Sequence, residues 1–262
     1  MKNKKGWYIT KSALSLFVLL NLTHFAYSQK SDSTKVVSHF GGAVTVTNNG
    51  ISLIPNFTLG KPATIFDLSM GRGKLSFEPQ FRFALEGKPW SFLFWWWYKL
   101  LKTDKFQINI GAHHAIAFRT KTFLIDDVSK EIIVAQRYLA GELSPNYSLS
   151  KNISIGMYYL YSYCMEKDAV KNTNFLALRC NFSNIRLSKQ FLIRFNPQIY
   201  YLKMDEKDGF YITSALTLAK RNFPVSIFTI INQPVQTDIP ASKNFIWNAS
   251  LIYSFNKEYV EK

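Results

Sequence analysis

Apolar and polar side chains alternate along residues 74–86, and this period of two is typical of a β-strand with one apolar and one polar face. Gly87-Lys88-Pro89 then predicts a tight turn, because glycine and proline both interrupt regular structure. The opposite face carries Glu78 and Arg82, charges that a dry core would reject. A wall with lipid outside and a polar lumen inside suits both faces, so the pattern predicts a transmembrane β-barrel. The returning half of the hairpin places on its outward face Trp90, Phe92, Phe94, Trp96 and Tyr98.

The rest of the chain divides into similar segments separated by turn signals, as in an all-β, antiparallel up-and-down barrel. Asn48-Asn49-Gly50 predicts the first hairpin, because Asn-Gly is a strong hairpin signal. Residues 61–73 fit either an extra strand or an irregular turn that folds into the lumen. We expect the turn, because bacterial single-chain barrels have even strand numbers. The predicted strands are then twelve, at residues 36–47, 51–60, 74–86, 90–101, 106–118, 131–148, 153–164, 174–184, 191–203, 210–219, 223–233 and 244–255.

The connections beyond residue 100 alternate between long and short. Outer-membrane barrels place short turns in the periplasm and long loops outside. This alternation therefore predicts that both termini are periplasmic. The long connections are predicted at residues 119–130, 165–173, 204–209 and 234–243, the short ones at 102–105, 149–152 and 220–222, and an intermediate one at 185–190.

Residues 1–28 predict a secretory signal peptide. Lysines precede an apolar stretch at residues 13–20, and Ala26-Tyr27-Ser28 supplies small residues at the positions that a signal peptidase reads. The apolar stretch is too short for a membrane-spanning helix. Residues 29–262 are predicted to form a single barrel domain in the outer membrane of a Gram-negative cell. The final strand resembles the signal of barrel-assembly machinery, with spaced aromatics ending at Phe255, although residues 256–262 continue beyond it.

The formal net charge of +15 is spread over single basic residues in turns and loops. No polybasic block supports nucleic-acid binding. The partners expected from this charge are outer-membrane lipid, the phosphates of lipopolysaccharide and small anionic solutes.

Polar and charged residues on the inward phase of the strands are the candidate functional residues. They either line a solute path, in which the arginines favour anions, or form salt bridges and hydrogen bonds that plug a narrow lumen. Two inward tryptophans either fill space or stack a ring-bearing solute. The predicted lumen-lining residues are Glu78, Gln80, Arg82, Trp95, Trp97, Asn109, His113, Glu142, Arg179, Asn181, Arg194, Asn196 and Gln198.

The sequence shows no recognisable catalytic centre. Only one of His113 and His114 can face outward, and no hydrolase motif accompanies them. Four histidines and two cysteines do not fall into a metal-ligand spacing, so we expect neither metal nor cofactor. Cys164 and Cys180 are predicted on opposite faces and therefore as free thiols. A passive narrow pore or structural barrel fits best; a lipid-modifying or hydrolytic barrel enzyme and an accessory subunit of an envelope complex are the alternatives.

Several sequence blocks resemble a family of uncharacterised outer-membrane barrel proteins from Bacteroidota-type bacteria. The likeness spans nearly the whole chain after the signal peptide. It implies the barrel and its location, and no established activity. The blocks are LIPNFTLGKPATIFDLSMGRGKLSFEPQFRF, EGKPWSF, GELSPNYSLSKNISIGMYYLYS, LTLAKRNFP and WNASLIYSFNKEYV.

Overall fold

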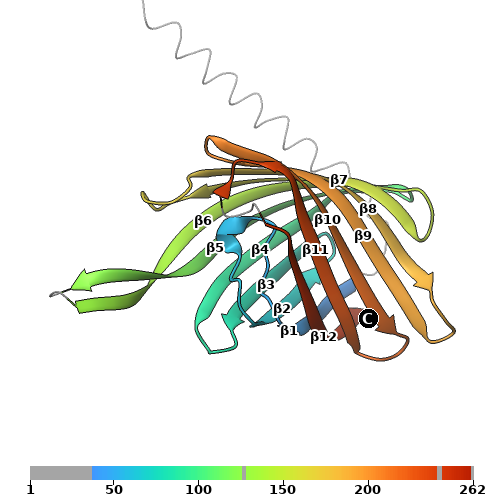
Figure 1. Ribbon diagram of the computed structural model, residues 1–262. Helices are drawn as coiled ribbons and strands as arrows, with labels where there is room; N and C mark the ends of the chain where they lie inside the picture. Colours follow the sequence, from blue (N-terminus) through green and yellow to red (C-terminus); the bar gives the residue numbers. More distant parts are fainter. Residues whose placement is uncertain (1–36, 126–127, 241–243, 261–262) are drawn as a thin grey trace, which may run out of the picture. The chain divides into compact units, whose positions relative to one another are not determined.

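The computed structural model describes residues 37–125, 128–240 and 244–260 as a closed antiparallel barrel in which each strand pairs with its sequence neighbours and β1 pairs with β12 (Figure 1). The predicted signal peptide, residues 1–28, lies outside the described residues. The strands are β1 (Val37–Thr47), β2 (Ala63–Arg72), β3 (Leu75–Ala84), β4 (Pro89–Lys102), β5 (Phe106–Ile125), β6 (Val128–Ser148), β7 (Ile153–Cys164), β8 (Asn172–Arg186), β9 (Phe191–Met204), β10 (Lys207–Lys220), β11 (Val225–Thr237) and β12 (Ile246–Val260).

The twelve-strand antiparallel barrel predicted from the sequence is confirmed. Alternation sends large apolar side chains outward, as in Tyr159 and Tyr161 of β7 and Leu176 and Leu178 of β8, all exposed. Such a band suits the hydrocarbon region of a bilayer. Closure between Val37 and Val260 pairs the first strand with the last and leaves no open edge there. Within the described residues, the structure contains no helix with the length and apolar character needed to span a membrane.

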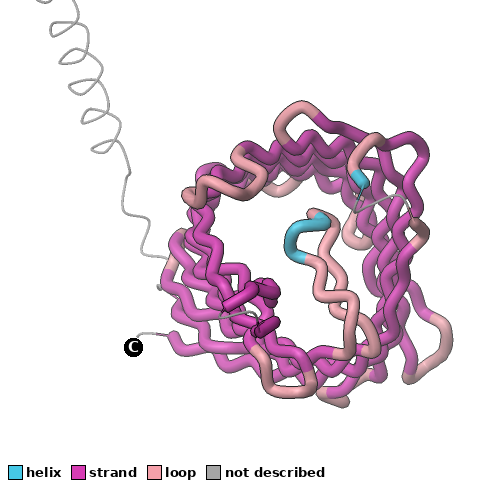
Figure 2. Tube along the Cα trace, turned by 60° about the vertical axis from the view of Figure 1, so that its left-hand side comes forward, coloured by secondary structure: helices cyan, strands magenta, loops and turns pink. Residues whose placement is uncertain are grey.

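The strand predicted at residues 51–60 is wrong. Residues 48–62, which we call the in-folded segment, run inside the ring of strands and carry the short 3₁₀ helix η1 (Pro55–Phe57), as Figure 2 shows. A proline lacks the N–H that a ladder needs, which disfavours a strand at Pro55. The turn predicted at residues 61–73 is also wrong, because β2 covers most of it and pairs with β1 and β3. One predicted strand is absent and one predicted turn is a strand, so the two errors offset each other and the total of twelve strands is unchanged.

We call the end of the barrel opposite Val37 and Val260 the distal end. The long loop predicted there at residues 119–130 is wrong, because β5 and β6 continue as a two-stranded ribbon paired from Phe118↔Ala135 to Ile125↔Val128. The ribbon extends past the neighbouring strands in Figure 1. Its β-branched and aromatic residues favour extended structure.

Two other predicted loops at the distal end are also shorter than expected. Residues 204–209 reduce to a tight turn in which Asp205 has φ 52°, and β11 continues to Thr237 within the loop predicted at 234–243. The tail predicted from residue 256 belongs to β12 up to Val260. The in-folded segment and residues 165–171, 238–240 and 244–245 nevertheless lie at the distal end, while the opposite end carries short turns.

We expect the ribbon to be dispensable for the barrel. Ala117 is the last β5 residue paired with β4, and Tyr138 is the first β6 residue paired with β7. Replacing residues 120–133 with an Asn-Gly turn removes no strand pairing of the closed wall and only an exposed ion pair between Lys88 and Glu131 at 3.9 Å. The turn itself suits a two-residue hairpin. A folded barrel migrates faster on a gel when the sample is not boiled than after boiling. The shortened protein should keep this difference. Identical migration before and after boiling would show that the ribbon is needed for folding.

Cys164 and Cys180 are both free, as the strand phases predict. Cys164 is buried, and its backbone N–H donates to the Lys171 carbonyl at 2.8 Å. Cys180 lies further along β8, where it pairs with Ile155 of β7.

Candidate functional site: the lumen

The distal half of the lumen is filled by apolar side chains. The in-folded segment contributes Leu53, Ile54 and Phe57, which pack against inner-wall residues of strands β4 to β10. Phe57 lies against Tyr138, with ring centroids 4.8 Å apart. Burying an aromatic side chain of this size stabilises by about 2 kcal/mol. The walls supply two clusters: Ala140, Leu160, Phe175, Ala177, Tyr200, Leu202, Met204 and Tyr211 with Ile239 of the loop after β11, and Leu93, Ala115, Ala117, Tyr138 and Cys164.

Trp90 holds the in-folded segment to the wall. The pairing of β3 with β4 shifts between Arg82↔Ser91 and Phe83↔Pro89, so Trp90 is the extra residue of a β-bulge. The bulge explains why the prediction of an outward Trp90 is wrong: its side chain is 1% exposed and Nε1 donates to the carbonyl oxygen of Phe57 at 2.7 Å. A buried tryptophan N–H needs such an acceptor.

The base of the in-folded segment is fixed by backbone hydrogen bonds. The Gly50 N–H donates to the Lys61 carbonyl at 2.8 Å, and the Leu59 N–H donates to the Gly50 carbonyl at 2.9 Å. A Cβ on Gly50 would stand 3.1 Å from the Trp90 ring. The close approach therefore favours glycine at this position.

A cavity of about 250 Å³, which we call the central cavity, is enclosed between the in-folded segment and the barrel wall. Its lining combines apolar residues of the segment and the wall with polar residues of the same and neighbouring strands. Two arginines line it, and none of its lining residues is acidic. The lining consists of Ser52, Leu53, Ile54, Phe57, Arg82, Leu93, Trp95, His113, Tyr158, Leu160, Ser162, Phe175, Arg179 and Gln198.

The two arginines are oriented by neighbours on the inner wall. Arg82 donates from Nη2 to Gln80 Oε1 at 2.6 Å and lies over the Trp90 ring at 5.1 Å. Arg179 donates from Nη2 to Ser144 Oγ at 2.6 Å and lies over the Tyr158 ring at 5.5 Å. The Nε atoms of both are buried without a hydrogen-bond partner among the described residues. Each guanidinium has five N–H donors, so donors remain for an anion in the lumen.

A second cavity of about 390 Å³, which we call the side cavity, lies along β1 to β4 and shares Arg82, Trp95 and Tyr158 with the central cavity. Glu78, Gln80 and Trp97 line it. Since the two cavities share these residues, they lie on either side of one group of side chains.

The rings of the inner wall stack on one another. Trp95 and Trp97 are nearly parallel, with centroids 5.5 Å apart and an interplanar angle of 7°. Trp95 also contacts His113, with centroids 3.6 Å apart. The stack leaves Trp95 partly exposed toward both cavities, so it is available to a ring-bearing solute as well as filling space.

His113 and Glu142 form a buried pair on adjacent strands. His113 Nδ1 lies 3.4 Å from Glu142 Oε1, and the two side chains are 5% and 0% exposed. His114, the next residue, points outward and stacks on Phe94 with centroids 4.5 Å apart. Glu142 therefore belongs to the wall behind the central cavity and not to its lining.

Five of the predicted residues, Glu142 among them, lie outside both cavity linings. Asn109 accepts from Gln107 Nε2 at 2.9 Å, and Asn196 donates to Asn181 at 2.9 Å. Arg194 is exposed on β9. These residues do not join the cluster around Arg82 and Arg179. Sequence reasoning missed Tyr158, Phe175 and the in-folded residues as cavity residues; only the inward phase of β7 and β8 could have indicated the first two.

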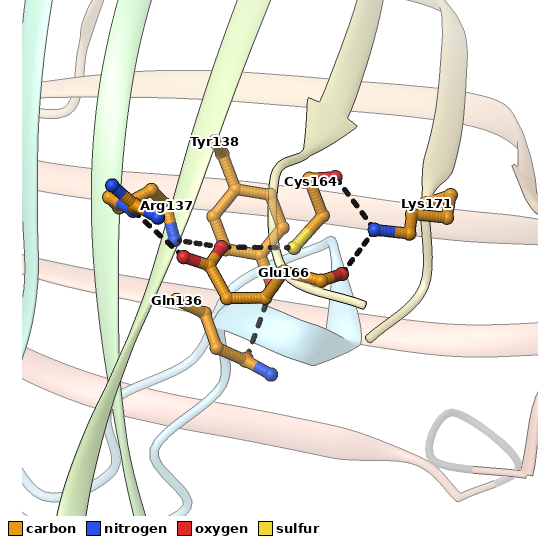
Figure 3. Close-up of polar contacts among 6 residues, drawn as sticks. All are labelled: Gln136, Arg137, Tyr138, Cys164, Glu166 and Lys171. Atoms are coloured by element: carbon orange, nitrogen blue, oxygen red, sulfur yellow. Dashed lines mark hydrogen bonds and ion pairs between the residues drawn. The ribbon is translucent and has the colours of Figure 1, made fainter. Parts of the chain in front are cut away.

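The distal rim is tied by polar contacts between β6 and the loop after β7 (Figure 3). Glu166 accepts from the backbone N–H and from Nε of Arg137, both at 2.8 Å. Slight burial raises the pKa of Glu166, but the hydrogen bonds from Arg137 outweigh it and lower the pKa below its ordinary value. Lys171 Nζ donates to the Glu166 carbonyl. Among the described residues, no group of three or more His, Cys, Asp or Glu side chains could hold a metal ion.

Comparison with solved structures identifies the architecture. The KdgM porin superposes with a TM-score of 0.50 at 9% identity, over 83% of this chain and 99% of that chain. The fold is that of an outer-membrane β-barrel. KdgM in complex with disordered oligogalacturonate has a TM-score of 0.49, also at 9% identity, over 83% and 99% of the two chains. The NanC porin has a TM-score of 0.46 at 8% identity, over 85% and 100%. No family model and no curated protein matches the sequence.

Proposed function

We propose that the protein is a narrow outer-membrane pore for small anionic solutes, with the in-folded segment as its constriction. The observation that carries the proposal is the position of this segment inside the barrel, where it lines one cavity together with two arginines and no acidic residue. Cationic side chains at a constriction favour anions. The apolar outer face and the porin-like fold support placement in the outer membrane.

In this proposal both termini face the periplasm and the distal end faces outward. The short turns at the end with Val37 and Val260, together with the longer connections at the distal end, support this orientation. Assignment to the Bacteroidota-type family stays a proposal that rests on the sequence blocks alone. Lipopolysaccharide would contact the barrel from the outer leaflet, and barrel-assembly machinery would insert it.

The proposal predicts that the Trp90→Phe variant conducts better than the parent in planar bilayers. The substitution keeps most of the ring but removes the N–H that donates to the Phe57 carbonyl, which loosens the constriction. The matched control is Trp96→Phe, on the outward face of the same strand, which should leave conductance unchanged. A parent and a Trp90→Phe variant that both lack measurable conductance would contradict the pore.

Charge selectivity gives a second prediction. Replacing Arg82 and Arg179 together with glutamine should reduce the anion preference measured from reversal potentials in a salt gradient. Arg194→Gln is the control, because Arg194 is exposed and outside both cavity linings. Selectivity that is unchanged in the double variant, or reduced equally by the control, would assign Arg82 and Arg179 to a structural network.

A further inference from the structure

The central cavity is amphipathic, because apolar and cationic side chains share one lining. Ile54 and Phe57 of the in-folded segment, with Leu160 and Phe175 of the wall, form an apolar part. The guanidinium groups of Arg82 and Arg179 lie in the same lining. An ordinary water-filled pore would need no apolar part of this kind beside its charged residues.

We propose that the central cavity binds a small amphiphilic monoanion, a carboxylate attached to one ring or a short acyl chain. This inference rests on the proposed function, since the solute reaches the cavity through the lumen. The carboxylate would accept hydrogen bonds from Arg82 and Arg179, which are charge-assisted and therefore stronger than neutral ones. Their Nε atoms are buried without a hydrogen-bond partner among the described residues, which shows that the wall does not saturate these groups.

The apolar body of the solute would lie against the in-folded segment and the aromatic wall. Trp95 and Tyr158 line the same cavity and offer ring faces or edges for stacking. A volume of about 250 Å³ is below the usual range for drug-sized ligands, so the cavity fits one small solute and not an oligosaccharide.

Two carboxyl groups lie near the arginines but outside the central cavity lining. Asp67 lines the side cavity and interacts electrostatically with Arg82, and Glu142 interacts with Arg179 and lies 3.4 Å from His113. Neither is part of the central cavity lining. An anion in the central cavity would therefore compete with these two carboxyls for the guanidinium groups and would meet no acidic residue in the lining itself.

The test is isothermal titration of three probes against the full barrel in lipid nanodiscs, with empty nanodiscs subtracted. Phenylacetate carries the proposed chemistry, glucuronate has the same charge on a polar body, and 2-phenylethylamine has the same body with the opposite charge. We expect binding of phenylacetate, and no measurable binding of the other two. The Arg82→Gln/Arg179→Gln variant should bind phenylacetate at least about tenfold more weakly, the loss expected for a charge-assisted hydrogen bond.

Three comparisons distinguish a loss of phenylacetate binding in the glutamine variant from misfolding of that variant. Arg82→Lys/Arg179→Lys keeps both charges and should bind better than the glutamine variant. Arg194→Gln should bind phenylacetate as the parent does. Unboiled gel migration checks that each variant keeps its barrel.

Equal binding of phenylacetate and glucuronate, or unchanged binding in the glutamine variant, would overturn the inference. Conductance of the same preparations reports on the pore separately. Phenylacetate binding without conductance would support the cavity and contradict the pore, whereas conductance without selective phenylacetate binding would leave the pore and overturn the cavity assignment.

Discussion

Replacing residues 51–59 with a Ser-Gly pair should raise single-channel conductance several-fold. The deletion removes Phe57, Ile54 and Leu53 from the distal lumen, and water and ions can then occupy their volume. The chain can close at this point because the Gly50 N–H already donates to the Lys61 carbonyl. Conductance in planar bilayers measures the effect.

The shortened ribbon variant, without residues 120–133, is the matched control. It also deletes a distal segment, but one whose strands pair only with each other and whose contact with the rest of the barrel is the exposed Lys88–Glu131 ion pair. Its conductance should equal that of the parent. A deletion of 51–59 that leaves conductance at the parent value in a folded barrel would show that the in-folded segment is not the constriction.

Replacing His113 with alanine should destabilise the barrel by about 3 kcal/mol. The substitution leaves the Glu142 carboxyl, which is 0% exposed, without the imidazole 3.4 Å away. It also removes a buried ring that packs against Trp95, so the loss combines an unfilled volume with one polar neighbour fewer for a buried carboxyl. Urea titration of the protein in lipid vesicles measures the loss of unfolding free energy.

His114→Ala is the matched control, because His114 faces outward on the same strand and loses only its stacking on Phe94. The double variant His113→Ala/Glu142→Leu should recover most of the lost stability, since it removes the stranded carboxyl as well. A single His113 variant as stable as the parent would show that Glu142 does not depend on this partner.

The faces of the strands could be predicted from the sequence because a period of two fixes them wherever lipid covers one side. His113 and His114 illustrate this: one lies in the lumen wall and the next stacks on an outward phenylalanine. Closure and the free cysteines follow from the same alternation, whereas the strand number was right because the false strand at 51–60 offset the missed strand β2.

The constriction could not be predicted in the same way. Residues 51–59 alternate as a strand would, yet packing of Phe57 and Ile54 inside the lumen outweighs local pattern. Pro55 was the available signal against a strand. Trp90 was misplaced because a bulge changes the phase of one residue, and nothing in the alternation indicates where a bulge occurs.

The sequence predicted several residues of the site, but it did not predict which of them share a cavity. Arg82 and Arg179 were expected in the lumen, but strand phase does not say which inward residues share a cavity across the barrel. Arg194 has the same phase and lies outside it. Sharing a cavity depends on the height of each residue along the barrel and on the segment folded above it.

The most direct measurement of the central claim is the current through a Ser52→Cys variant, in a background with Cys164 and Cys180 replaced by serine, before and after a charged thiol reagent. Ser52 lies in the in-folded segment and lines the central cavity. If solutes pass beneath this segment, the reagent should reduce the current, while the same reagent on Ser129→Cys in the ribbon should leave it unchanged. A current unaffected by complete modification of Ser52→Cys, verified by mass spectrometry, would contradict the account.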